Sequence, residues 1–323
     1  MKVQPLGMPY TDKATHIAQC LELAILLEVS ADKPGNVNLV VGFEGTNHMH
    51  FLASAVAAAP HFKAAAERGI TVAKGELSLN DAQVGQIIRD CIADINSWQS
   101  GGNTLLGTII LLVPIAVAAG MTPTADGNIF EIPELRWRLR QVVESTTPED
   151  AVAVYEAIAI AKPSGLGKAP DLDVNDPSSV KRIREEKISL YQVFKIASGY
   201  DNVCSEWVNG YPITFDFAYP KLLSRIKEDK NLDVAITHTF LEVLSAYPDT
   251  FIARKAGIER AKWVSAMAAE VLKHGGLKTY KGRRKLKELD NALRRESNIL
   301  NPGTTADIIA AAIALNNLAG YKP

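Results

Sequence analysis

Four short polar segments contain the side chains best suited to chemistry. They are, in chain order, Lys33-Pro34-Gly35-Asn36, Gly101-Gly102-Asn103-Thr104, Ser164-Gly165-Leu166-Gly167 and Asn301-Pro302-Gly303-Thr304-Thr305-Ala306-Asp307. Glycine lets a phosphate group approach the backbone closely, and the free N–H groups at a helix start attract anions. Because each segment stands beside a run of apolar residues, the set predicts a partly buried site for a phosphorylated ligand. Any one segment taken alone is more typical of a plain turn or helix cap.

Carboxylates near these segments could bind a metal ion. Mg²⁺ usually binds one or two carboxylates together with phosphate oxygens of its ligand, rather than a complete protein cage. The sequence therefore predicts a site for Mg²⁺ and a polyphosphate, with the candidate metal ligands Glu28, Asp171, Asp173, Asp249 and Asp307. A single aspartate of this kind is more often a turn or cap residue, so the prediction depends on the whole set.

The basic side chains support a nucleotide more than a zinc ion. Lys33 and Arg254 are candidate partners of phosphate groups, and His48 and His50 could hydrogen-bond a phosphate or a base. Two histidines spaced i, i+2 do not share a helix face, and no third ligand pattern accompanies them. A Gly-x-Ser-x-Gly turn does not occur in the sequence, so a hydrolase with a serine nucleophile is not supported.

Composition excludes several other classes. The chain has 323 residues and 47% hydrophobic content, and its 35 Lys and Arg nearly balance its 36 Asp and Glu. No overall basic field favours nucleic acid, and the basic stretch at 278–287 is typical of a solvated helix face. The three cysteines and a polar N-terminus predict a cytoplasmic protein. The apolar run 104–121 contains Gly107 and Pro114, so we interpret it as a buried helix rather than a membrane span.

Helical periodicity dominates the chain and must position these residues. We expect an all-α fold, a single globular multi-helix domain over residues 1–323 with buried central helices. The expected helices cover 14–29, 51–68, 80–98, 104–119, 148–162, 180–198, 201–208, 218–229, 232–247, 258–274, 281–295 and 304–318. The helices at 104–119 and 304–318 are very apolar, so their starts should meet in the interior. No strand precedes a glycine-rich turn, which excludes a Rossmann or P-loop site.

The same segments also carry a resemblance to a known family. Glu28 followed by Lys33-Pro34-Gly35, His48 followed by Phe51 and Ser54-Ala55, and Gly102-Asn103-Thr104 with Gly107 occur in order. They continue with Gly165-Leu166-Gly167 and Asp173-Val174, then Asp249, Arg254 and Gly257, then Pro302-Gly303 and Ala306-Asp307. In this order and spacing the chain resembles the triphosphoribosyl-dephospho-CoA synthase family from about residue 21 to 318.

The resemblance implies an all-α transferase with ATP and 3′-dephospho-CoA as substrates. A ribose hydroxyl of dephospho-CoA would attack C1 of the ATP ribose, adenine would leave, and the triphosphate would stay on the transferred sugar. Candidate catalytic carboxylates are Glu28, Asp173 and Asp307. The candidate nucleotide-binding residues are Lys33, Gly35, Asn36, His48, His50, Asn103, Thr104, Gly165, Gly167, Arg254, Asn301, Gly303, Thr304 and Thr305.

The chain departs from the family pattern at two places. Leu105-Leu106 stand where well-known members have His-Lys, and Thr304-Thr305 stand where Gly-Ser is common. A related Mg²⁺- and nucleotide-dependent transferase with a different acceptor, for example in the cofactor synthesis of one-carbon metabolism, is therefore an alternative. A non-enzymatic helical ligand-binding protein is a second alternative. The sequence does not indicate an oligomeric state.

Overall fold

The structure is a computed structural model that describes residues 12–125, 128–295 and 298–323. Residues 1–11, on which the expectation about the polar N-terminus depends, lie outside the described residues. The described chain is mostly helical, with one short antiparallel hairpin of β1 (Thr124–Ala125) and β2 (Ile129–Phe130). The prediction of an all-α globular fold is confirmed. None of the helices in these ranges has the length and hydrophobicity needed to cross a membrane.

The helices follow one another with short connections. Their bounds are α1 Lys13–Ser30, α2 His48–Ala73, α3 Val84–Trp98, α4 Leu106–Met121, α5 Ile132–Glu144, α6 Pro148–Ala161, α7 Pro177–Glu185, α8 Leu190–Ala197, α9 Asn202–Asn209, α10 Tyr219–Asp229, α11 Leu232–Ala246, α12 Thr250–Ala256, α13 Ile258–Lys273, α14 Tyr280–Arg294 and α15 Gly303–Leu318. Short 3₁₀ turns lie at η1 Leu79–Asp81 and η3 Gly276–Lys278, and a π-helical segment, η2, spans Ile213–Ala218.

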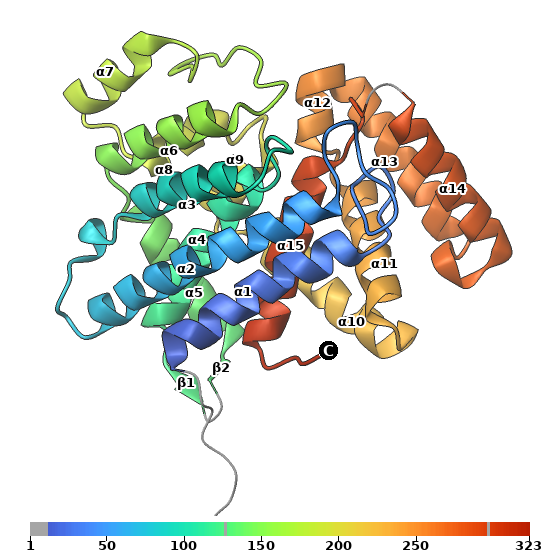
Figure 1. Cartoon of the computed structure of the whole chain (residues 1–323), viewed down its shortest axis with the longest axis horizontal. Coiled ribbons are helices and arrows are strands. Elements are labelled where there is room, and N and C mark those ends of the chain that lie inside the picture. The colour runs from blue at the N-terminus through green and yellow to red at the C-terminus, as the bar shows by residue number, and fades with distance from the viewer. Residues whose placement is uncertain (1–11, 126–127, 296–297) are drawn as a thin grey trace, which may run out of the picture.

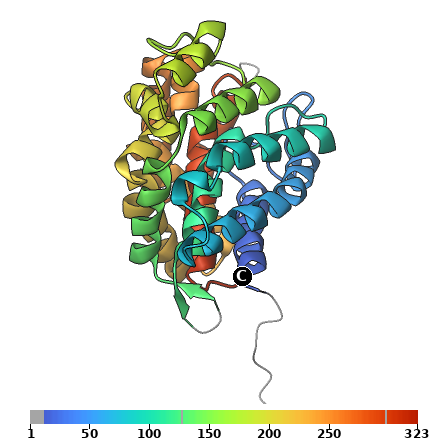
Figure 2. The same cartoon turned by 90° about the vertical axis from the view of Figure 1, so that its left-hand side faces the viewer.

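Helices α4 and α15 form the centre of the molecule. Every residue of α4 except Gly107 is buried, and α15 is buried throughout its last eleven residues, from Ile308 to Leu318. Figure 1 shows α1 and α2 crossing in front of this pair, and Figure 2 shows α15 between the N-terminal helices and the later ones. The sequence predicted both helices as central, because a helix that is apolar on all sides must be covered on all sides.

Glycine permits the closest helix contact in the core. A Cβ atom on Gly69 of α2 would overlap the carbonyl oxygen of Val117 in α4, and one on Gly120 of α4 would overlap that of Ala66. The two helices therefore pack backbone to backbone at this crossing. The contact fixes α4, and with it the position of the α4 N-terminus.

The structure differs from the sequence prediction at several elements. The single helix expected over 180–198 is two helices, because α7 ends at Glu185 and Ser189 starts α8 with a capping box. Helices α5 and α12 were not predicted. The second helix begins at His48 rather than at residue 51, because Asn47 caps it.

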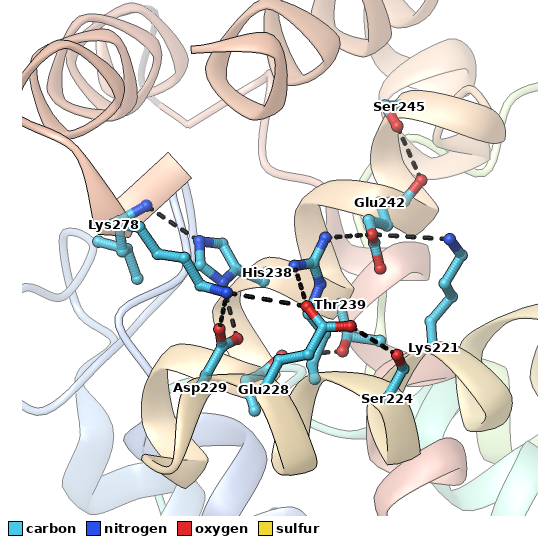
Figure 3. Close-up of polar contacts among 12 residues, drawn as sticks. Lys221, Ser224, Glu228, Asp229, His238, Thr239, Glu242, Ser245 and Lys278 are labelled. Atoms are coloured by element: carbon cyan, nitrogen blue, oxygen red, sulfur yellow. Dashed lines mark hydrogen bonds and ion pairs between the residues drawn. The ribbon is translucent and has the colours of Figure 1, made fainter. Parts of the chain in front are cut away.

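A polar cluster joins α10, α11 and the η3 turn in the C-terminal part of the chain (Figure 3). Asp229, at the end of α10, bonds Nδ1 of His238 in α11 at 2.9 Å and the Lys278 amine at 2.6 Å. His238 Nε2 accepts the backbone N–H of Leu277 at 3.0 Å. A buried carboxylate or imidazole is tolerated only with such partners, so this cluster is a structural joint.

Candidate functional site

The four polar segments meet around one cavity of about 680 Å³. The lining includes Asn36 from the first segment, Asn103 and Thr104 from the second, Ser164 and Gly167 from the third, and Asn301, Gly303, Thr304 and Asp307 from the fourth. Glu28, Asp171, Asp173 and Arg254 also line it. A cavity of this size is typical of small-molecule sites. The structure thus brings together residues that the sequence separates by almost three hundred positions.

The starts of α4 and α15 both open onto this cavity. Their N-cap residues, Leu105 and Pro302, provide no side-chain cap, but other side chains bind N–H groups of the first turns: Asn103 Oδ1 accepts the Leu106 N–H at 3.1 Å, and Asp249 accepts the Thr305 N–H at 2.7 Å. The positive end of a helix dipole therefore faces the cavity from two directions, which favours an anion. The prediction that the two helix starts meet in the interior is confirmed.

Asp307 lies inside α15 and does not cap it, although Thr304-x-x-Asp307 has the spacing of a capping box. Helix α15 already begins at Gly303, and the Asp307 carboxylate accepts the Thr108 hydroxyl of α4 at 2.6 Å. A Cβ on Gly107 would overlap Asp307 Oδ2, so glycine at 107 is what lets the carboxylate lie against α4. Burial, together with the nearby Glu28 carboxylate, raises the pKa of Asp307 to about 8. Asp307 can therefore hold a proton at neutral pH.

Glu28 lies in the last turn of α1 and is 6% exposed. Lys33, which is 1% exposed, places its amine 3.2 Å from the Glu28 carboxylate and also donates to the carbonyl oxygens of Glu28 and Ala31. Burial raises the pKa of Glu28, and the Lys33 ammonium opposes that rise. Two neighbouring carboxylates thus differ in environment, since Glu28 has a cation partner and Asp307 has a hydroxyl partner. Such a difference is how a site separates a base from an acid.

Arg254 is a cation at the cavity wall. Asp201 caps α9 through one oxygen and binds the Arg254 guanidinium through the other. The Nε of Arg254 is buried and has no hydrogen-bond partner among the described residues. The guanidinium therefore keeps N–H donors for a ligand. Asp201 fixes its orientation, and recognition of a phosphate requires both.

The two loop aspartates line the cavity and also hold their own loop in shape. Asp173 accepts the N–H groups of Ala169 at 2.9 Å and Asn175 at 2.8 Å. Asp171 accepts the N–H of Leu172 at 2.8 Å and the Arg182 guanidinium at 2.7 Å. These hydrogen bonds lower the pKa of both carboxyls, so both stay ionised near neutral pH and are weak proton acceptors.

Seven predicted site residues lie away from the cavity lining in the described structure: Lys33, Gly35, His48, His50, Gly165, Asp249 and Thr305. Asp249 accepts the N–H groups of Phe251 and Ile252, and its other oxygen accepts both the N–H and the hydroxyl of Thr305 at 2.7 Å. His50 accepts the Asn47 N–H at the start of α2. In these contacts Asp249 and His50 hold helix starts in place. Direct contact of the seven residues with a ligand stays a prediction.

Comparison with known proteins decides the family. A family model described as ATP:dephospho-CoA triphosphoribosyl transferase matches residues 14–323. The chain belongs to this family. A protein of Stutzerimonas stutzeri (strain A1501) is 30% identical over 110 residues, which are 34% of this chain and 37% of that protein. A Malonomonas rubra protein is 27% identical over 143 residues, 43% of each chain.

Both relatives carry the provisional name 2-(5''-triphosphoribosyl)-3'-dephosphocoenzyme-A synthase. The alignments span less than half of their lengths. A crystal structure from Archaeoglobus fulgidus, provisionally named triphosphoribosyl-dephospho-CoA synthase, has a similar fold with a TM-score of 0.60 and 24% identity. It covers 84% of this chain and 100% of its own. The likeness to that structure concerns the fold.

A metal ion bound in this cavity would need some of its ligands from the substrate of the protein. In the described ranges, no group of three or more His, Cys, Asp or Glu side chains is arranged to hold a metal. That arrangement fits Mg²⁺, which takes one or two carboxylates and completes its shell with phosphate oxygens and water. Asp173, ionised and on the cavity wall, fits such a ligand best.

Sequence reasoning missed several lining residues. Gly107 belonged to a motif but had no role assigned, and Thr108, Asp201 and Lys255 were not predicted at all. One whole wall is apolar and comes from helices α6, α8 and α9, with the residues Val154, Ile158, Val193, Phe194 and Val203. No sequence motif marks such a wall, because its residues look like any other core positions. Leu105 and Leu106 also line the cavity and extend its apolar part.

Proposed function

We propose that the protein transfers the triphosphoribosyl group of ATP to a ribose hydroxyl of 3′-dephospho-CoA and releases adenine. The observation that carries this proposal is the pair of buried carboxylates, Glu28 and Asp307, in one cavity onto which the starts of α4 and α15 face. A glycosyl transfer needs an acid, a base and a stabilised anion in one place. The three unpaired cysteines fit a reducing compartment such as the cytoplasm.

The triphosphate would bind to the helix starts and to Arg254. The positive dipole ends of α4 and α15 and the Arg254 guanidinium supply a fixed positive potential that needs no reorganisation. Asp173 would hold Mg²⁺ together with phosphate oxygens, and bound Mg²⁺ would neutralise part of the triphosphate charge. Thr304, in the first turn of α15, adds a hydroxyl at the same end of the cavity.

Glu28 and Asp307 would divide the proton transfers. Glu28 takes the proton of the attacking hydroxyl, whose oxygen forms the new bond to C1 of the ATP ribose. The bond between C1 and adenine N9 breaks, and its electron pair stays on adenine, which Asp307 protonates. Lys33 stabilises Glu28 in the ionised form before the reaction, and burial keeps the Asp307 proton in place near neutral pH.

Adenine release tests this proposal. We expect the protein, with Mg²⁺, ATP and dephospho-CoA, to form free adenine that chromatography detects, and to form none when dephospho-CoA is left out. ADP or free triphosphate in place of adenine would contradict the proposed reaction.

A different acceptor is the second candidate function, and the leucine pair favours it. Leu105 and Leu106 are 2% and 8% exposed and stand where well-known family members have His-Lys, so the cavity has an apolar pair in place of a cation. An acceptor with less charge at this point would fit the apolar wall better. A panel of nucleoside and coenzyme acceptors, compared by adenine release, decides between the two candidates.

A further inference from the structure

Two asparagine side chains at the cavity wall each have one buried polar atom without a hydrogen-bond partner among the described residues. Asn36 is 7% exposed, and its Nδ2 finds no hydrogen-bond acceptor in the described part of the chain. Asn301 Oδ1 is likewise buried and finds no donor there. Both residues line the cavity. A buried polar atom without a partner costs about 1–3 kcal/mol, so its persistence at a ligand cavity points to the ligand as its partner.

The two segments that carry these amides lie against each other. A Cβ on Gly35 would meet Cδ of Pro302 at 3.1 Å, so the first and fourth polar segments are in packing contact. Figure 1 shows the chain after α1 passing beside the end of α14 and the start of α15. Asn36 and Asn301, each one residue from this contact, both line the cavity, so their side chains come from neighbouring parts of its wall.

Helix α14 fixes the first of these segments. Asp290 accepts the Gly35 N–H at 2.7 Å and the Arg294 Nε at 2.8 Å, and Arg294 donates to the Asn36 carbonyl oxygen at 2.6 Å. Two hydrogen bonds thus hold the backbone at Gly35 and Asn36, and the Asp290–Arg294 bond joins the two side chains that make them. A side chain held this way is pre-organised for a ligand, which lowers the entropy cost of binding.

The chemistry of the two free atoms selects the group they bind. Asn36 offers a donor and Asn301 offers an acceptor. An ionised phosphate only accepts hydrogen bonds and would leave Asn301 unsatisfied, whereas a metal ion accepts none and would leave Asn36 unsatisfied. A hydroxyl group both donates and accepts, so a sugar hydroxyl satisfies both atoms.

We propose that Asn36 and Asn301 bind the 2′- and 3′-hydroxyls of the ribose that is transferred, and so select ribonucleotide over deoxyribonucleotide donors. This inference rests on the proposed function and names the part of the ATP molecule, its ribose, that the two asparagines bind. A site built to bond a hydroxyl rejects an analogue without it strongly, because the buried amides are left unpaired. Hydrogen bonds to the hydroxyl beside the reacting carbon also strengthen as the glycosyl bond breaks.

The test compares ATP with 2′-deoxy-ATP and 3′-deoxy-ATP as donors. For the wild-type protein we expect kcat/KM to fall by about 100-fold or more when the bonded hydroxyl is missing. In Asn36→Ala and Asn301→Ala, kcat/KM for ATP should fall, and the ratio between ATP and the deoxynucleotide should drop to about tenfold or less. The matched control is Asn103→Ala at the same cavity, which should slow all donors equally and keep the wild-type ratio.

Isosteric variants assign the atoms. Asn36→Asp removes the donor and should lose discrimination, whereas Asn301→Asp keeps an acceptor oxygen and should retain most of it. Circular dichroism melting confirms that each variant folds. Unchanged ratios in both alanine variants, or a wild-type protein that uses deoxynucleotides as well as ATP, would overturn the inference while leaving adenine release from ATP intact.

If ATP gives no adenine at all, calorimetry still tests the pair by comparing the binding of ATP with that of its deoxy analogues. We expect the wild-type protein to bind ATP more tightly than the analogues and the alanine variants to lose this difference. Equal affinities in the wild-type protein would contradict the inference.

Discussion

At the scale of single residues, the site depends on one carboxyl group that folding keeps protonated. Asp307 lies against α4 with a hydroxyl donor and no cation in its immediate contacts, and burial raises its pKa to about 8. The sequence analysis predicted Asp307 as a catalytic and metal-binding candidate, but it could not predict the raised pKa of this carboxyl group. It arises from the packing of α4 against α15, which no local pattern encodes.

Asp307 should couple activity and stability to pH. The folded protein holds this proton more tightly than the unfolded chain, so ionisation costs stability as pH rises from the ordinary carboxyl range through about 8. Asp307→Asn should therefore raise the Tm relative to wild type more near pH 8 than near pH 5, while turnover falls by about 10²–10⁴-fold. Thermal melts and adenine assays across pH check both. Equal Tm shifts at the two pH values would contradict this account.

Gly107→Ala tests the same carboxyl group from its neighbour. The new Cβ would overlap Asp307 Oδ2 and displace it from Thr108, so we expect turnover to fall about 100-fold or more in a folded protein. Gly199→Ala is the matched control, because a Cβ there meets no heavy atom within 4 Å. Adenine release per mole of protein is the measurement. A Gly107→Ala protein with wild-type turnover would remove Asp307 from the mechanism.

At the scale of elements, the sequence predicted the central helices well but did not predict which aspartates cap a helix. Helices α4 and α15 were recognised because they are apolar on all sides. Asp249 was predicted as a metal ligand, yet in the structure it caps the seven-residue α12 and bonds Thr305. A carboxylate that caps a helix and one that binds a cation look the same in a single sequence, since both stand beside turns. Only packing distinguishes them.

Helix α14 should support nucleotide binding without touching the nucleotide. Asp290→Ala removes the acceptor of the Gly35 N–H and loosens the segment that carries Asn36. We expect kcat/KM for ATP to fall about tenfold, which corresponds to loss of one hydrogen bond to a charged group. Glu288→Ala on the same helix is the control, because Glu288 is exposed and pairs only with Lys285 and Arg284 among the described residues. Equal kcat/KM values for the two variants would exclude a role of Asp290 in nucleotide binding.

At the scale of the whole molecule, the cavity of the candidate site is separate from the polar cluster that joins α10, α11 and η3. The all-α class followed from helical periodicity along the chain. The apolar wall of the cavity did not, since α6, α8 and α9 contribute to it from separate stretches. The cluster in Figure 3 is equally polar but has its partners within the protein.

That separation predicts a variant with the opposite behaviour to Asp307→Asn. Asp229→Ala removes the carboxylate that holds His238 and Lys278, and we expect a loss of about 3–5 kcal/mol in the free energy of unfolding. Turnover per folded molecule should stay at the wild-type level below the melting temperature. Denaturant unfolding and adenine assays measure the two quantities. A change in donor specificity would show that the joint and the cavity are coupled.

The fate of the ATP ribose tests the central claim most directly. ATP labelled with ¹³C in its ribose and ³²P in its γ-phosphate is incubated with Mg²⁺, dephospho-CoA and the protein, and the products are separated and weighed by mass spectrometry. The account predicts both labels in one product joined to dephospho-CoA, with one free adenine formed for each. Labels that remain in ATP, or that appear in free ribose triphosphate or separately in ADP and phosphate, would contradict it.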